Sequence, residues 1–232
     1  MASIPPISVA FLLFPNVTQL DLTGPAQVLS RLGNVTLDLV WKDRAPVTTD
    51  AGFAIMPTAT FAEVPRVDIL CIPGGMGVTD VIADEAAMAW VRSVGAEAHW
   101  VTSVCTGSLI LGAAELLKGY RAATHWSWRE YLAMFGAEMV PERVVVDRNR
   151  VTGGGVTAGI DFGLFVAAQV FGPTVAQEIQ LMIEYSPDPP FDSGSRKTAP
   201  QSLIENVSNA RQRIQTERRA IAERVARRSA HL

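Results

Sequence analysis

Short apolar runs along the chain alternate with segments in which apolar residues recur at helical spacing. Residues 7–14 and 67–75 are continuous apolar runs, typical of parallel strands buried on both faces, and residues 35–41 alternate like a strand. Residues 99–104 predict a further strand, and residues 52–58 predict a short one near an edge of the sheet. The pattern therefore predicts several well-separated strands.

Helical patterns fill the spaces between these strands. We expect the first helix from about residue 24, with Thr23 as its N-cap and Pro25 in its first turn. Later helices are expected at these places: after Asp84, over 106–117, over 127–136 with Gly136 at its end, near Thr157 and near Pro173. Residues 143–155 predict a hairpin, because Asp147 to Asn149 supply turn chemistry.

Strands that alternate with helices predict an α/β fold, a three-layer sandwich with a mostly parallel central sheet. We expect this domain over residues 1–185, a Pro- and Ser-rich linker over 186–200 and a C-terminal amphipathic helix over 201–232. The apolar residues of that last helix are Leu203, Ile204, Val207, Ile214, Ile221 and Val225. Ligands of such sheets bind at the carboxyl ends of the strands, which the chain leaves at 15–24, 73–77 and 104–107.

Composition supports a folded chain with a well-buried core, since 48% of the residues are hydrophobic and 19% are charged. The net charge of −3 gives no general attraction to nucleic acid. Residues 200–232 hold seven arginines against three glutamates, a local charge of +4 that leaves −7 on the rest. This tail either contacts an acidic partner or forms a solvated helix that packs on the body or on another subunit.

The sequence also bears on location. No apolar run reaches the roughly 18 residues of a membrane span, and no basic residue precedes the first apolar run as in a secretion signal. Two cysteines without such a signal favour a reducing cytoplasm over a disulfide. We therefore expect a cytoplasmic protein that binds neither membrane nor nucleic acid.

Cys105 lies in "VTSVCTGSLILG", where a predicted strand passes into a predicted helix. A side chain at such a tight turn projects above the sheet, as in the nucleophile elbow of hydrolases. Backbone amides and partial positive charge at a helix start lower a thiol pKa from about 8.5 to roughly 3.5–7.5. We therefore predict Cys105 to be a nucleophile held as thiolate, and Cys71, in mid-strand, to be a small buried apolar residue.

A nucleophile also needs a group that handles protons. Asp21 follows the first strand and either faces Cys105 from the neighbouring strand end or caps the helix that follows. His125 is either a base for Cys105 or a packed structural residue beside Trp126. The glycine turn over 73–77 offers backbone amides to a ligand.

Bound cofactors are not expected. The segment "TGGGVTAGID", residues 152–161, resembles a phosphate-binding loop, but it lacks a Walker lysine and a ribose-binding acid at a matching offset. No Cys and His cluster has the spacing of metal ligands, so no metal is predicted.

Taken together, "FPNVTQLDLTGP", "IPGG", "SVCTGSLILG", "ATHW" and "TGGGVTAGID" resemble the ThiJ/PfpI superfamily, which has a class I glutamine amidotransferase-like fold. The resemblance runs from residue 8 to about 185. Within the superfamily the chain is similar to the isocyanide hydratase group, and that similarity continues into "IEYSPDPPFDSGS" and the arginine-rich tail.

This resemblance implies roles for particular residues. It makes Cys105 the nucleophile and Asp21 the acid that contacts it, at a position where many superfamily members carry Glu. Thr106 follows the nucleophile, where protease-like members carry His, and this counts against peptidase activity. It also implies that the Gly75 amide holds polar intermediates and that the loop around Gly154 and Val156 lies close to the nucleophile.

The activity implied is cysteine-dependent hydration of a small-molecule isocyanide to an N-substituted formamide through a covalent thioimidate, with no cofactor, in a homodimer. Three other functions remain open. One is a glyoxalase or carbonyl-repair enzyme that uses the same cysteine, and another is a redox sensor in which Cys105 is oxidised. The third is a regulator-type ligand-binding domain, although its DNA-binding module needs about 100 further residues and residues 200–232 show no second helix-turn-helix pattern.

Overall fold

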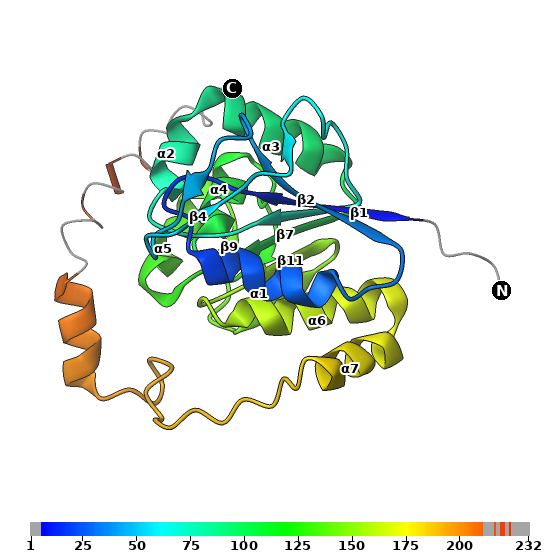
Figure 1. Ribbon diagram of the computed structural model, residues 1–232. Coiled ribbons are helices and arrows are strands. Elements are labelled where there is room, and N and C mark those ends of the chain that lie inside the picture. The colour runs from blue at the N-terminus through cyan, green and yellow to red at the C-terminus, as the bar shows by residue number, and fades with distance from the viewer. Residues whose placement is uncertain (1–5, 211–215, 217–218, 221–222, 224–232) are drawn as a thin grey trace.

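The computed structural model describes residues 6–210, 216, 219–220 and 223, and Figure 1 shows its layers. A seven-stranded sheet in the order β10-β11-β7-β6-β1-β2-β5 forms the centre. Every neighbouring pair runs parallel except β10 and β11. Its strands are β1 (Ile7–Leu12), β2 (Val35–Trp41), β5 (Ala59–Thr60), β6 (Ile69–Ile72), β7 (Trp100–Val104), β10 (Val144–Asp147) and β11 (Arg150–Gly153).

Helices cover both faces of the sheet, which confirms the predicted three-layer α/β sandwich (Figure 1). One face carries α1 (Gln19–Leu29), α6 (Ala158–Phe171) and α7 (Pro173–Met182). The other carries α2 (Val78–Ala83), α3 (Glu85–Glu97), α4 (Gly107–Ala113) and α5 (Arg129–Leu132). Asp84 caps α3 as expected, because its carboxylate accepts from the backbone N–H groups of Ala86 and Ala87.

The three central strands β7, β6 and β1 supply the core. Their apolar side chains are buried whichever face they point to, as at Phe11, Leu12, Ile69 and Leu70. This burial on both sides explains why the sequence shows continuous apolar runs there instead of alternation. Because these three neighbouring strands run parallel, their carboxyl ends lie at one edge of the sheet, where the candidate site lies.

The predicted start of the first helix is wrong by about one turn. The helix α1 begins at Gln19 with Thr18 in the N-cap position, so Pro25 lies inside it. Leu22, Pro25 and Leu29 are buried at helical spacing, and this apolar stripe continues the helix to the N-terminal side of Pro25. Asp21 therefore stands in the first turn of a helix.

Other local expectations were also too regular. Residues 127–136 fold as three short pieces, η1 (Trp126–Trp128), α5 and η2 (Ala133–Phe135), although Gly136 does end them in a left-handed conformation. The segment expected near the sheet edge gives β4 (Ala54–Ile55), which pairs with β3 (Val47–Thr48) outside the main sheet. A second pair joins β8 (Arg121–Ala122) to β9 (Glu138–Met139).

Residues 186–200 contain neither helix nor strand and are almost entirely exposed, and they lead to a helix over 201–210 that Figure 1 draws in orange. Of the apolar residues expected on that helix, Ile214, Ile221 and Val225 lie outside the described residues. The division of the chain at 185 and 200 stays a prediction. None of the helices within the described residues has the length and apolarity that a bilayer span requires.

Close packing of α4 against β6 sets the geometry of the site. An ideal Cβ on Gly107 would lie 2.1 Å from the Ile72 carbonyl oxygen and 2.8 Å from that of Pro73. Glycine is therefore required for the first turn of α4 to reach the end of β6.

Gly107→Ala is expected to lower the free energy of unfolding by about 1–3 kcal/mol, because the methyl group forces α4 away from β6. Urea unfolding followed by circular dichroism measures this. Gly33→Ala is the matched control, since nothing lies within 4 Å of its ideal Cβ. Equal midpoints for the two variants would contradict the packing argument.

Candidate active site

Cys105 adopts a left-handed backbone conformation, with φ 57°, directly after β7. Residues other than glycine rarely adopt this conformation, and it persists only where the surroundings enforce it. Here the Cys105 N–H donates to the Gly153 carbonyl at 3.1 Å. Its own carbonyl accepts from the Thr124 hydroxyl at 3.0 Å and from the Ser108 hydroxyl at 3.2 Å. The backbone is thus fixed in the elbow that the sequence predicted.

The loops after β1 and β6 meet beside this elbow. Val17 and Gly75 form an isolated antiparallel bridge, and the Thr18 N–H donates to the Gly74 carbonyl at 3.0 Å. The Gly74 N–H donates to Asp21 Oδ2 at 3.0 Å. An ideal Cβ on Gly74 would lie 2.6 Å from Thr106 and 2.8 Å from Asp21, so only glycine permits this approach.

Asp21 has no exposed surface, and its Oδ1 accepts no hydrogen bond from the described residues. Burial raises the pKa of its carboxyl from 3.8 to about 7, although the Gly74 N–H and the neighbouring Cys105 thiol partly oppose this. Asp21 was expected either to face Cys105 or to cap the following helix, and the structure supports the first of these roles. A carboxyl with this pKa exchanges protons readily near neutral pH.

The predicted lowering of the Cys105 pKa is wrong. Burial raises the pKa of the thiol well above its usual value, and the negative charge of Asp21 raises it further. The backbone N–H and hydroxyl of Thr106 act in the opposite direction without overcoming these effects. Because the two acids face each other, they titrate as a pair that retains a proton at neutral pH.

Thr106 lies where the sequence placed it, beside the sulfur at the start of α4. Its hydroxyl accepts from the Gly75 N–H at 3.1 Å. The Gly75 amide, expected to hold polar intermediates itself, is therefore engaged with Thr106 in this structure. Besides Asp21, the groups oriented toward the sulfur are the amide and the hydroxyl of Thr106.

The loop that contains Gly154 and Val156 follows Gly153, the last residue of β11, whose carbonyl accepts from the Cys105 N–H. An ideal Cβ on Gly154 would lie 3.8 Å from the Thr124 carbonyl oxygen, and Val156 is half-buried against the core. The described contacts place this loop next to the elbow. They do not assign it a binding role.

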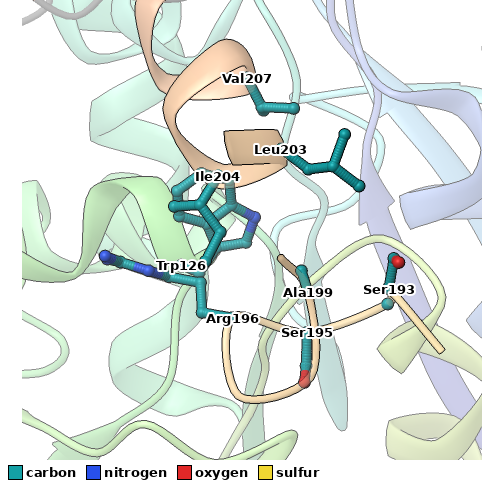
Figure 2. Close-up of a pocket in the computed structure, with 9 residues that line it drawn as sticks. Trp126, Ser193, Ser195, Arg196, Ala199, Leu203, Ile204 and Val207 are labelled. Atoms are coloured by element: carbon teal, nitrogen blue, oxygen red, sulfur yellow. The ribbon is translucent and has the colours of Figure 1, made fainter. Parts of the chain in front are cut away.

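His125 belongs to a turn instead of to the proton-handling pair. Its Nδ1 lies 2.7 Å from the Ser127 hydroxyl and accepts from the Ser127 N–H at 3.3 Å, so the ring caps η1. This favours the structural role left open for it. Trp126, next to it, borders a separate hollow against helix 201–210, where the Arg196 guanidinium lies 5.4 Å from the Trp126 ring centroid (Figure 2).

Sequence reasoning missed Thr124, a small residue in a loop between elements, because nothing in its spacing shows which distant group it contacts. It named the glycine turn over 73–77 as a source of backbone amides for a ligand, and the structure shows that the Gly74 amide of this turn donates to Asp21. Within the described part of the chain, no group of three or more His, Cys, Asp or Glu side chains is arranged to hold a metal ion.

The chain is similar to known proteins in both sequence and fold. The model of the DJ-1/PfpI family matches residues 7–169. An isonitrile hydratase from Pseudomonas putida is 52% identical over 201 residues, which cover 87% of this chain and 88% of that protein. A ThiJ/PfpI family protein from Pseudomonas syringae, solved by crystallography, gives a TM-score of 0.91 at 45% identity and covers 95% of this chain and 90% of that chain.

A regulator is also similar. The HTH-type transcriptional regulator GbdR of Pseudomonas aeruginosa is 27% identical over 188 residues, which cover 78% of this chain and 51% of the regulator. The likeness to the hydratase is therefore both stronger and more complete over the two lengths.

The raised pKa of Asp21 predicts how stability changes with pH. The folded chain binds this proton more tightly than the unfolded chain, so the free energy of unfolding falls as pH rises from 3.8 to about 7 and this contribution is constant above that range. Asp21→Asn removes the effect. We expect the variant to gain stability relative to the natural protein between pH 5 and pH 8, by at most about 3 kcal/mol. Urea unfolding of both proteins at pH 5 and at pH 8 measures this. If the free energies of unfolding of the variant and the natural protein differ by the same amount at the two pH values, the assignment of the raised pKa to Asp21 is contradicted.

Proposed function

Since this chain belongs to the DJ-1/PfpI family, we propose that it is a cysteine-dependent isocyanide hydratase that converts an isocyanide to an N-substituted formamide. The observation that carries the proposal is its likeness to the Pseudomonas putida isonitrile hydratase over most of both chains, isonitrile being another word for isocyanide. The geometry supports it, because a buried thiol and a proton-binding carboxyl lie side by side in a site fixed by three loops.

The first step adds the Cys105 thiol to the terminal carbon of R–N≡C. The thiol proton passes to Asp21, the sulfur forms a bond to the carbon, and Asp21 returns the proton to the same carbon. The product is the thioimidate R–N=CH–S–Cys105. A pair that retains one proton at neutral pH suits this step, since the carbon must gain both sulfur and hydrogen.

The second step consumes water. Asp21 takes a proton from water as the water oxygen attacks the thioimidate carbon, and passes this proton to the imine nitrogen to give R–NH–CH(OH)–S–Cys105. The carbon–sulfur bond then breaks as the hydroxyl of this intermediate loses its proton to Asp21, Asp21 passes that proton to the sulfur, and R–NH–CHO leaves. The amide and hydroxyl of Thr106 stabilise negative charge on the departing sulfur, because both favour its ionised form. No electrons are transferred to or from an external acceptor.

The direct test supplies an alkyl or aryl isocyanide and measures formamide. Cys105→Ala is expected to abolish turnover, and Asp21→Asn to lower kcat by about 10²–10⁴-fold through loss of proton transfer. Gly33→Ala, which changes an open surface position, should keep full activity. Formamide production by Cys105→Ala would remove the covalent mechanism, and full activity in Asp21→Asn would remove the role of the carboxyl. Methylglyoxal as an alternative substrate tests the carbonyl-repair function.

We further propose that the chain forms a homodimer in the cytoplasm. Large apolar side chains are exposed on the adjoining helices α6 and α7, namely Phe165 (48%), Leu181 (82%) and Met182 (65%). Large apolar side chains exposed on neighbouring helices are candidates for an interaction surface. Residues 200–232 carry a local charge of +4 and the rest of the chain carries −7, a balance that favours association of one copy with another.

Sedimentation at micromolar concentration tests this assembly. The natural chain is expected to sediment as a dimer, and Leu181→Lys with Met182→Lys is expected to shift it toward monomer because two charges replace exposed apolar surface. A natural chain that sediments as a monomer would contradict the proposal.

A further inference from the structure

Arg143, the residue just before β10, contacts both ends of the loop beside the nucleophile. Its carbonyl accepts from the Gly154 N–H at 2.8 Å, and its guanidinium donates to the Thr157 hydroxyl at 3.2 Å. The residue before this loop, Gly153, gives its carbonyl to the Cys105 N–H. One arginine therefore holds the segment 154–157 at its two ends, next to the contact that fixes the elbow.

The guanidinium of Arg143 is itself anchored by Asp161 in the first turn of α6. Its Nε lies 2.7 Å from Asp161 Oδ2, and a terminal nitrogen lies 2.6 Å from the same oxygen. The Tyr185 hydroxyl donates to that oxygen at 3.0 Å. The Asp161 side chain is 28% exposed and that of Arg143 is 53% exposed, so the pair lies at the surface and serves to fix geometry more than to stabilise the fold. The contact joins β10, the start of α6 and the chain just after α7.

We propose that Arg143 is a positioning residue for the reaction. It touches no reacting atom, and it acts by holding the 153–157 segment so that the Gly153 carbonyl keeps Cys105 in its left-handed conformation. Losing the guanidinium frees both the end of the loop and the first turn of α6, so the sulfur shifts relative to Asp21 and Thr106. Small displacements of a reacting group lower the rate of the chemical step. The inference rests on the proposed function for its kinetic readout.

Arg143→Met tests the inference, with Arg148→Met as the matched control. Arg148 lies at the other end of the same hairpin, pairs with Asp147 at 3.2 Å and donates to the Gly119 carbonyl, away from Cys105. We expect Arg143→Met to lower kcat by about tenfold with KM changed less than about twofold, and Arg148→Met to keep both constants. Arg143→Lys should recover part of kcat, since an ammonium group still reaches Asp161.

A variant of Asp161 tests whether the Arg143–Asp161 ion pair, and not Arg143 by itself, positions the loop. Asp161→Asn is expected to reproduce the loss in kcat, and the double variant with Arg143→Met should lose no more than either single one, because both changes release the same anchor. If the two losses in kcat multiply, Asp161 does not act through Arg143 and the inference is overturned. Should Arg143→Met fail to fold, Arg143→Lys and Asp161→Asn decide the question.

The rate at which iodoacetamide alkylates Cys105, followed by mass spectrometry of its peptide, gives a readout that needs no turnover. Loosening the loop should expose the sulfur, which lies in a residue only 6% exposed, and raise this rate about threefold in Arg143→Met but not in Arg148→Met. Equal kcat and equal alkylation rates in these two variants would overturn the inference. A natural chain without activity toward isocyanides would refute the proposed function, and the alkylation rates would still decide the role of Arg143.

Discussion

A buried carboxyl facing a buried thiol is the interaction on which this site depends. Asp21 and Cys105 are both buried, and burial makes a negative charge on either one unfavourable. The charge of Asp21 raises the pKa of the Cys105 thiol further, whereas the thiol partly supports the carboxylate. The chain tolerates this cost because the groups around the pair compensate it in part. The Gly74 N–H supports the carboxylate, and the amide and hydroxyl of Thr106 support the sulfur. The result is a pair of acids that retains a proton at neutral pH within a buried site.

The sheet explains why these groups meet. Adjacent parallel strands β1, β6 and β7 end at one edge, so the loops after them supply Asp21, the glycine turn and Cys105. Each part is then held by contacts to the next loop: Thr18 to Gly74, Gly75 to Thr106, and Cys105 to Gly153. The left-handed backbone at Cys105 is a strained conformation that these contacts stabilise. Precision at the sulfur is thus a property of several loops acting together.

Much of this architecture follows from the sequence alone, because continuous apolar runs and turn residues identify the parallel strands and their ends. The position of Cys105 between strand and helix follows from the same pattern. The direction of its pKa shift does not, since it depends on burial and on Asp21, which sequence spacing leaves undetermined. The contacts of Thr124 and Arg143 could not be predicted either, because their partners lie far away in sequence. The predicted start of the first helix is wrong because Thr23 and Pro25 have the residue types of a helix start but lie inside the helix, within its apolar stripe.

Mass spectrometry of the protein quenched within one turnover of isocyanide tests the central claim most directly. The account predicts a covalent adduct with the mass of the isocyanide on the peptide that holds Cys105, present in the natural chain and absent in Cys105→Ala. It also predicts that Asp21→Asn slows both the appearance and the decay of this adduct, because one carboxyl serves both steps. Formamide that accumulates with no adduct at any time, in a chain whose Cys105 remains free, would contradict it.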